Sequence, residues 1–589
     1  MRTIPLRLLA CLVVGSLLVP ACGSTDSPAT PASNDGQRVP QLPPAPGGKA
    51  DSYVNQAARE FEFTGTAHMA APSGLESMTP EDADKALKKA ADSRLASVAS
   101  AIQSYLSSKA REMNAQIPGE LPPEIAAQVQ NVDDATRRRI LENWKTQQEV
   151  SAATRSSKRH LESIRKEADG SYAFDFEVEA LMSNKLSEKV FTAGDTFEVT
   201  VTQYSAEPKS ETIVVKGKQT ASSDGYPRYD ELFSDGVLEV ALHIGGDYNK
   251  EEVEICCAGD GGEPSCHKET CANSCEPVED ACSRPAPEGC TATKLGGRID
   301  RWTAEGMVNL LKEQGFSHEA STYKDLKIDS PPFVKTFDFA GTPVEVRVKI
   351  VYPEIVACGE EQKLVESMKE SLATREVIIY AGHAGPGAGY VLDYQPSVEL
   401  DDSVWKTLPM PQTYQVLVMY GCQTYSTYAD AMYANPNKND ANLNVVTTVN
   451  TMWTNMGLPG TSTVLFGMLM QENESQRHLP VSWLNLLSWL NLQDQNAHTH
   501  YGVHGVDSNP KMSPWVRTSD LCGPCEKDTD CPGGGNFCLT FPDGTKGCGA
   551  VCTDDSGCGD GYGCIAIPGL EGSVIPKMCV PLDMSCRTP

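Results

Sequence analysis

The chain has 589 residues, 40% of them hydrophobic, so it is long enough for several domains that each bury a sizeable core. Its formal net charge of −28 repels phosphate backbones and excludes nucleic acid as a partner. The 21 cysteines are typical of a protein that folds in an oxidising compartment.

Residues 1–22 have the pattern of an export signal. Arg2 and Arg7 give a charged start, a short apolar core follows over 8–19, and small residues then lead to Cys22. The pattern resembles a bacterial lipoprotein signal, which implies lipidation at Cys22, a membrane contact through that lipid and a place in the cell envelope, at the outer membrane or cell surface. An ordinary secretory signal is the alternative. Residues 23–52, rich in Ser, Pro, Ala and Gly, are expected to form a flexible tether.

Residues 53–220 are predicted to form an α+β accessory domain. A strand over 61–69 precedes a helix start at Thr79, after which apolar residues recur at helical spacing. More helix is predicted over 123–167. Alternating apolar and polar residues then predict strands at 172–181, 196–204 and 211–217. No residue pattern in this domain points to chemistry.

From residue 221 to 516 strands alternate with helices, which predicts an α/β fold with a mostly parallel sheet and helices on both faces. The strongest segments are predicted strands at 237–244, 344–352, 377–382 and 416–421, and predicted helices at 304–314 and 362–373.

Two segments are rich in cysteine. Residues 255–293 carry seven cysteines among many Gly, Pro and Glu residues and are expected to be a disulfide-stapled insertion in the α/β domain. Residues 517–589 form a tandem repeat with ten cysteines, too short to hold together by a core. Zinc binding at Cys522 and Cys525 is an alternative, but disulfides are favoured in an exported chain without a histidine nearby.

The number of cysteines predicts one free thiol. With Cys11 in the signal and Cys22 lipidated, the ten cysteines of the tail form an even set. The seven of the insertion become even when Cys358 is added, which leaves Cys422. The alternative is that Cys358 is the free thiol and Cys422 is paired.

Cys422 ends the buried-strand pattern that begins at Val416. A second apolar run, from Val377 to Gly382, ends in the same way at His383. If both strands belong to one parallel sheet, the thiol and the imidazole emerge side by side at its carboxyl edge. A cysteine within hydrogen-bond distance of a histidine can act as a nucleophile, with the histidine as the group that carries its proton.

This order of strands, with histidine ending one and cysteine ending the next 39 residues later, resembles the caspase-hemoglobinase fold of the clan CD cysteine peptidases. The resemblance covers about half of the chain, and only the two strand ends are specific. It implies an endopeptidase that acts on proteins or peptides without a cofactor. Cys422 would be the nucleophile and His383 the proton donor to the leaving amine.

The resemblance also implies an oxyanion site made of backbone amides around Ala384, Gly385 and Gly421. Here the sequence departs from the family, because Ala384 stands where the family has glycine after the histidine. Gly421 stands where many members have alanine.

Two other functions stay open. The sheet could be an inactive scaffold in a surface lipoprotein whose cysteine-rich modules mediate adhesion or interaction. Alternatively, His498, His500 and His504, followed by Asp507, could hold the metal ion of a metal-dependent hydrolase, although no zinc-helix signature accompanies them.

Overall fold

The computed structural model describes the chain from residue 52 to residue 586, with gaps. The residues outside this description are 1–51, 117–120, 122, 131, 135, 139, 142–143, 145–149, 160–162, 193, 203–209, 247–250, 259–263, 273–285, 296–298, 385–388, 395–396, 450–451, 453–456, 494–499, 568–576 and 587–589. The predicted signal, Cys22 and the tether therefore lie outside the described residues.

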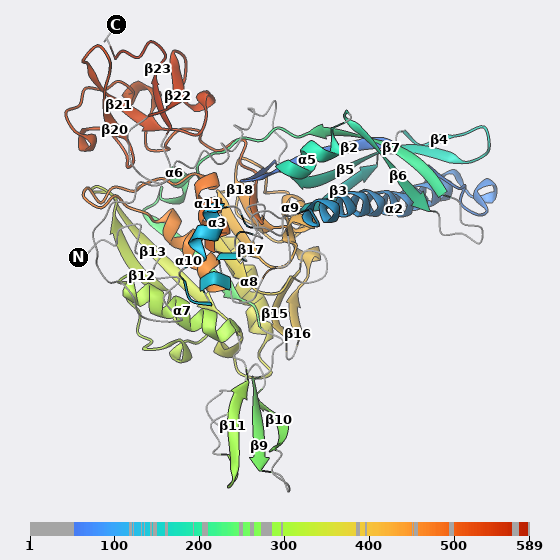
Figure 1. The fold of residues 1–589 in the computed structure, drawn as a ribbon, viewed down its shortest axis with the longest axis horizontal. Helices are drawn as coiled ribbons and strands as arrows, with labels where there is room; N and C mark the ends of the chain where they lie inside the picture. The colour runs from blue at the N-terminus through green and yellow to red at the C-terminus, as the bar shows by residue number, and fades with distance from the viewer. Residues whose placement is uncertain are drawn as a thin grey trace.

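A mixed, mostly parallel sheet of eight strands forms the centre of the molecule (Figure 1). Five neighbouring strands run parallel, and the strand next to them on either side is antiparallel to them. The short strand at one edge of the sheet is antiparallel to its own neighbour and so runs in the same direction as the five. The parallel strands are almost entirely buried, as expected where helices cover a sheet. In spatial order the strands are β1 (Tyr53–Asn55), β19 (Tyr501–His504), β18 (Leu443–Thr448), β17 (Gln415–Tyr420), β14 (Val377–Ala381), β8 (Val237–Ile244), β13 (Pro343–Val351) and β12 (Phe333–Asp338).

Helices contact both faces of this sheet. On one face, a Cβ added to Gly460 would lie 1.8 Å from the ring of Tyr420. Only glycine at this position lets the helix that contains it approach the sheet so closely. On the other face, the Ser371 hydroxyl lies 2.9 Å from Nε2 of His243. His243 is one residue out of step with Tyr420 in the parallel registers, so the two side chains point to opposite faces. The helices of this domain are α6 (Tyr229–Leu232), α7 (Ile299–Glu313), α8 (Gln362–Thr374), α9 (Tyr428–Tyr433), α10 (Gly457–Met468) and α11 (Trp483–Gln493).

An antiparallel half-barrel lies beside the central sheet (Figure 1). The long helix α2 (Pro80–Asn114) packs on it with the predicted apolar face, and its first turn is capped by the Thr79 side chain. The short helix α5 (Asn184–Val190) completes this part, and the short helix α3 (Pro123–Gln128) is drawn in front of the central domain (Figure 1). The strands are β3 (Ala152–Arg159), β5 (Tyr172–Ser183), β2 (Ala58–Met69), β7 (Ser210–Gln219) and β6 (Thr196–Thr202), with the short β4 (Arg165–Lys166) paired to β5.

The helix predicted over 123–167 is wrong at residues 152–159, which form β3. This segment is polar and has no apolar period, so only its pairing with β5 decides its conformation.

The half-barrel is connected to the central domain at the start of the described chain. Tyr53–Asn55 pair with β19 of the large sheet before the chain enters the half-barrel at Ala58.

A buried charged cluster connects the half-barrel to the central domain. The Arg155 guanidinium lies 3.2 Å from a carboxylate oxygen of Glu60 and 2.5 Å from one of Glu179, and all three side chains are at most 1% exposed. From the central domain, the Tyr425 hydroxyl donates to Glu60 over 2.9 Å, and Nδ1 of His504 lies 3.1 Å from Arg155. The cluster therefore joins the two domains through charged groups that are buried away from water and pair with one another.

Disulfides hold the two cysteine-rich segments. In the insertion, strands β10 (Pro264–Ala272), β9 (Glu251–Ala258) and β11 (Cys290–Leu295) project from the body (Figure 1), and disulfides link Cys256 to Cys266 and Cys257 to Cys290. In the tail, β20 (Phe537–Thr540), β21 (Lys546–Val551), β23 (Lys577–Pro581) and β22 (Tyr562–Ala566) form one antiparallel sheet. All ten tail cysteines pair within the tail, as 522–586, 525–538, 531–548, 552–564 and 558–579.

So many disulfides indicate an extracytoplasmic protein. Within the described part of the chain, no helix combines the length and the hydropathy that crossing a bilayer requires.

Replacing Arg155 by methionine is expected to lower the free energy of unfolding by about 3–5 kcal/mol, because Glu60 and Glu179 would remain buried without their cation. Urea unfolding followed by circular dichroism measures the change. Arg165→Met is the matched control, since Arg165 is 47% exposed on the same sheet and its ion pairs contribute about 1 kcal/mol or less. Equal free energies of unfolding for the two variants would contradict the proposed contribution of the charged cluster to stability.

Candidate active site

The ends of three neighbouring parallel strands bring the candidate residues together. Ala381 of β14 pairs in register with Tyr420 of β17 and with Ile244 of β8. The pairing continues one residue further, since the Gly382 amide donates to the Tyr420 carbonyl over 2.9 Å. His383 and Cys422 each come two residues after one of the paired positions Ala381 and Tyr420, at which the two strands end.

This edge is also where the chain changes direction across the sheet. Counted along the chain, the parallel strands have the spatial order two, one, three, four, five, because β13 lies outside β8 while β14 lies inside it. The crossovers from β8 and from β13 therefore leave in opposite directions and open a crevice between β8 and β14. Ligands of open α/β sheets bind at this position, beyond the carboxyl ends of the strands.

A pocket occupies that crevice. The space between its walls is about 450 Å³, including the part open to solvent. It is lined by Ile244, Gly245, Gly246, Asp300, Thr303, Ala381, Gly382, His383, Cys422, Met452 and Gly457. Both predicted residues of the dyad thus line one pocket.

His383 is held through its backbone. The Tyr380 hydroxyl lies 2.6 Å from the His383 carbonyl oxygen and 2.8 Å from that of Val391. Burial raises the pKa of Tyr380 well above its usual value, so the hydroxyl keeps its proton and remains a donor. The His383 ring packs at 82° to the Tyr394 ring, with 5.1 Å between centroids. The imidazole is half-buried and borders the pocket.

Cys422 is the free cysteine of the described part of the chain, and its side chain is half-buried. Cys358, the alternative candidate for the free thiol, is in a disulfide bond. The Cys422 sulfur lies 3.4 Å from the backbone nitrogen of Met452, which donates to it. A thiol that accepts a backbone hydrogen bond at a pocket wall has a fixed position.

A left-handed turn follows the cysteine. Gln423 has φ 55°, a conformation that non-glycine residues adopt rarely and at a cost in energy. Two buried threonines hold the turn. The Thr448 hydroxyl donates to the Gly421 carbonyl, and the Thr424 hydroxyl accepts from the Thr448 amide over 2.9 Å. The strained backbone is thereby fixed directly beside Cys422.

Gly421 and Ala384 lie against each other. A Cβ added to Gly421 would be 3.3 Å from both the amide nitrogen and the Cβ of Ala384. The absence of a side chain at position 421 therefore keeps the Ala384 amide close to the start of the cysteine turn. Gly385, the other predicted amide donor, lies outside the described residues.

Of the predicted histidine cluster, the described members His500 and His504 belong to no group of side chains that could hold a metal ion. His504 is fully buried in β19, with Nδ1 at 3.1 Å from the Arg155 guanidinium and Nε2 at 3.0 Å from the Thr447 hydroxyl. The positive charge of a guanidinium at this distance disfavours the binding of a metal cation by His504. His500 is also fully buried, and its ring packs against Tyr501. His498 lies outside the described residues.

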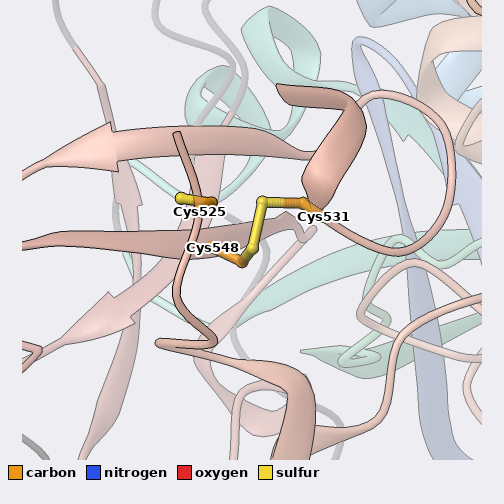
Figure 2. Close-up of side chains that lie close together, drawn as sticks. All are labelled: Cys525, Cys531 and Cys548. Atoms are coloured by element: carbon orange, nitrogen blue, oxygen red, sulfur yellow. A yellow bond between two sulfur atoms is a disulfide. The ribbon is translucent and has the colours of Figure 1, made fainter. Parts of the chain in front are cut away.

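Within the described residues, the groups of side chains that could geometrically hold a metal are two sets of tail cysteines. Figure 2 shows one of them, in which the sulfur atoms of Cys531 and Cys548 are joined and Cys525 lies beside them. Cys525 is itself bonded to Cys538. In the second set, Cys552, Cys558 and Cys579 are likewise in disulfides. Since metal ligation needs thiolates, these clusters are covalent cross-links.

Sequence reasoning missed the polar wall of the pocket. Asp300 and Thr303, from the first turns of α7, are 3% and 1% exposed and lie in the lining with Cys422 and His383. A signal was present, because Asp300 is a charged residue at the start of a helix that follows the insertion. Asp300 and His383 are more than 80 residues apart in the chain, so the sequence gives no indication that they line the same pocket.

Comparisons with known proteins give no relative: no family model, no curated protein and no solved structure matches this chain.

Thr448→Val is expected to lower the free energy of unfolding by about 1–3 kcal/mol, because the Gly421 carbonyl and the Thr424 amide lose a buried partner. It should also change the rate at which iodoacetamide labels Cys422, since the cysteine turn is no longer fixed. Thr374→Val, at the exposed end of α8, is the control and should stay within about 0.5 kcal/mol of the parent. Unchanged stability and labelling in Thr448→Val would show that the turn needs no such support.

Proposed function

We propose that the chain is an exported cysteine endopeptidase that uses Cys422 as nucleophile and His383 as proton carrier. The observation that carries this proposal is their shared pocket at the crevice of the sheet, together with a free thiol in a chain whose other described cysteine side chains are in disulfides. A compartment that favours disulfides leaves a thiol reduced chiefly where no partner can reach it.

In the proposed reaction, Cys422 Sγ attacks the carbonyl carbon of a peptide bond and forms a thioester. His383 takes the thiol proton and passes it to the nitrogen of the leaving amine, so that the carbon–nitrogen bond breaks. Water then attacks the thioester, releases the carboxylic acid product and returns the proton to sulfur. The proposed steps use the thiol of Cys422, the imidazole of His383 and one water molecule.

The oxyanion that forms during each attack needs backbone donors. The amides of Cys422 and Ala384 are the candidates, since Ala384 lies against the glycine that precedes the nucleophile. Each such donor contributes about 3 kcal/mol to the transition state in characterised enzymes. Alanine in place of the family's glycine at position 384 removes no donor, because the donor is the backbone amide.

The fold supports the same proposal at a coarser level. A mostly parallel sheet, with histidine and cysteine beyond the third and fourth parallel strands along the chain, is similar to the caspase-hemoglobinase arrangement. The export signal that ends at Cys22 supports lipid tethering at the cell envelope, at the outer membrane or cell surface. A peptidase held there would act on peptides or proteins outside the cytoplasm.

Cleavage of a mixed peptide library by the full-length protein tests the proposal. Cys422→Ser and His383→Gln should each lower the cleavage rate by about 10³-fold, because each removes one of two groups that act as a unit. His68→Gln is the control, since His68 is 49% exposed on the half-barrel and should leave the rate unchanged. Cleavage that survives in Cys422→Ser would overturn the assignment. A wild-type protein that cleaves no peptide would instead favour the inactive scaffold with working cysteine-rich modules.

A further inference from the structure

One edge of the half-barrel is open along the whole length of a strand. Within the described residues, β6 pairs with β7 alone, from Thr196 opposite Lys216 to Thr202 opposite Ser210. In an edge strand of this kind, every second residue directs its backbone N–H and C=O groups away from the sheet. The outer side of β6 therefore offers a row of donors and acceptors to another extended chain.

This edge lacks the features by which edge strands usually avoid pairing with a further chain. Its register with β7 is continuous, and β6 contains no proline and no lysine. The opposite edge strand, β3, is protected, because its register shifts after Arg155. The Gln103 side chain of α2 also hydrogen-bonds to the β3 backbone at Ala152 and Thr154. The contrast within one sheet indicates that the edge of β6 is kept accessible.

A groove runs along this edge, between β6 and α2. The space between its walls is about 1320 Å³, including the part open to solvent. From β6 it is lined by the five consecutive residues 198–202. Because their side chains alternate between the two faces of the sheet, the groove follows the edge of the strand and not one face. From α2 it is lined by small residues and one tyrosine: Ala96, Ser97, Ser100, Ala101, Ser104 and Tyr105.

The helix is attached to the sheet at both ends of the groove. At one end the Tyr105 ring stacks on the Phe197 ring, with 4.6 Å between centroids. At the other end the Arg94 guanidinium pairs with Glu211, which is opposite Val201 in the register. Between these attachments the lining spans about 14 Å along both the helix and the strand. The groove therefore has the length of about five residues of an added strand.

The walls of the groove specify the side chains of its occupant. An added strand places alternate side chains next to the buried Val199 and Val201 and below the small residues of α2, where valine, isoleucine or threonine has room. Its other side chains lie on the exposed face beside Glu198, the charged residue of the lining, so a lysine or arginine there forms a cross-strand ion pair. The net charge of −28 disfavours a second copy of this chain as the occupant.

We propose that the groove between β6 and α2 binds an extended segment of a partner protein by strand addition. The segment has β-branched side chains at alternate positions and a basic side chain between them. Main-chain hydrogen bonds to the edge of β6 provide affinity, and the two rows of side chains provide specificity. The linings of this groove and of the dyad pocket have no residue in common, so the proposal goes beyond the peptidase function and does not depend on it.

Fluorescence anisotropy with labelled heptapeptides tests the proposal. The probes are Thr-Val-Lys-Val-Thr-Val-Thr and its analogues with isoleucine or threonine in place of valine, and the protein is full-length Cys422→Ser, so that the proposed dyad cannot cleave them. Saturable binding of at least one probe is expected, and no binding of any probe would overturn the proposal.

Two N-methylated copies of the bound peptide show whether it binds as a strand. One copy is methylated on residues 2, 4 and 6 and the other on residues 3, 5 and 7. One copy should bind at least about tenfold more weakly and the other about as well as the parent, because only one edge of an added strand bonds to β6. Equal affinities of the two copies would overturn strand addition.

Two variants test the position of the peptide. Ser100→Trp should weaken binding at least about tenfold, because the indole fills the groove, whereas Ser93→Trp, at an exposed serine outside the lining, should not. Glu198→Lys should weaken binding of the lysine peptide about two- to fivefold and strengthen that of a copy with glutamate in place of lysine. Unchanged binding in Ser100→Trp, or the same peptide preference in Glu198→Lys, would overturn the assignment to this groove.

Two measurements on the wild-type protein do not depend on the folding of a variant. With saturating peptide, the amides of residues 196–202 should exchange their hydrogens at least about tenfold more slowly, and protection elsewhere but not in this segment would overturn the site. Sedimentation velocity of the protein alone should show a monomer. A dimer that Ser100→Trp dissociates would mean that a second copy occupies the groove, which would also overturn the proposal.

Discussion

The parallel register between β14 and β17 is the constraint on which the account of this protein depends. With Ala381 opposite Tyr420, the two strands end at the same level, and His383 and Cys422, each two positions further along the chain, both line the pocket. A slip of one residue would turn one of them to the opposite face, because side chains alternate along a strand. The register is fixed by burial, since the apolar side chains of both strands are in contact with covering helices. Packing of the core thus sets the geometry of the pocket.

The half-barrel contributes to the same edge from outside the sheet. Tyr425, three residues after Cys422, is completely buried and donates to Glu60 of the half-barrel, while the Arg155 guanidinium lies 5.6 Å from the centre of its ring. The left-handed turn at Gln423 is therefore held on one side by Thr448 and on the other by a charged cluster that cannot be exposed to water without loss. Removing the half-barrel would leave this turn without its outer support. The half-barrel is better described as a structural part of the candidate site than as a separate accessory unit.

The sequence predicted the features that depend on local patterns. The buried strands, the capped helix α2, the cysteine-rich modules and the pairing of Cys358 followed from hydrophobic periodicity, capping at Thr79 and the parity of cysteines. It failed where tertiary contacts decide. The polar segment around Arg155 was predicted as helix, because nothing local announces that its arginine neutralises two buried carboxylates across a sheet. His504 was a candidate metal ligand from spacing alone, yet its strand places it against that arginine. Asp300 went unnoticed since no pattern links a helix start to strand ends far along the chain.

The most direct test of the central claim is the labelling of Cys422 by iodoacetamide in the native, unreduced protein, followed by mass spectrometry of the peptide that contains it. The account predicts rapid labelling at neutral pH that is restricted to this residue and slowed at least tenfold in His383→Gln, because the imidazole no longer takes the thiol proton. Labelling that is absent in the native protein, or equally fast with and without the imidazole, would contradict the claim that this thiol and this histidine act together.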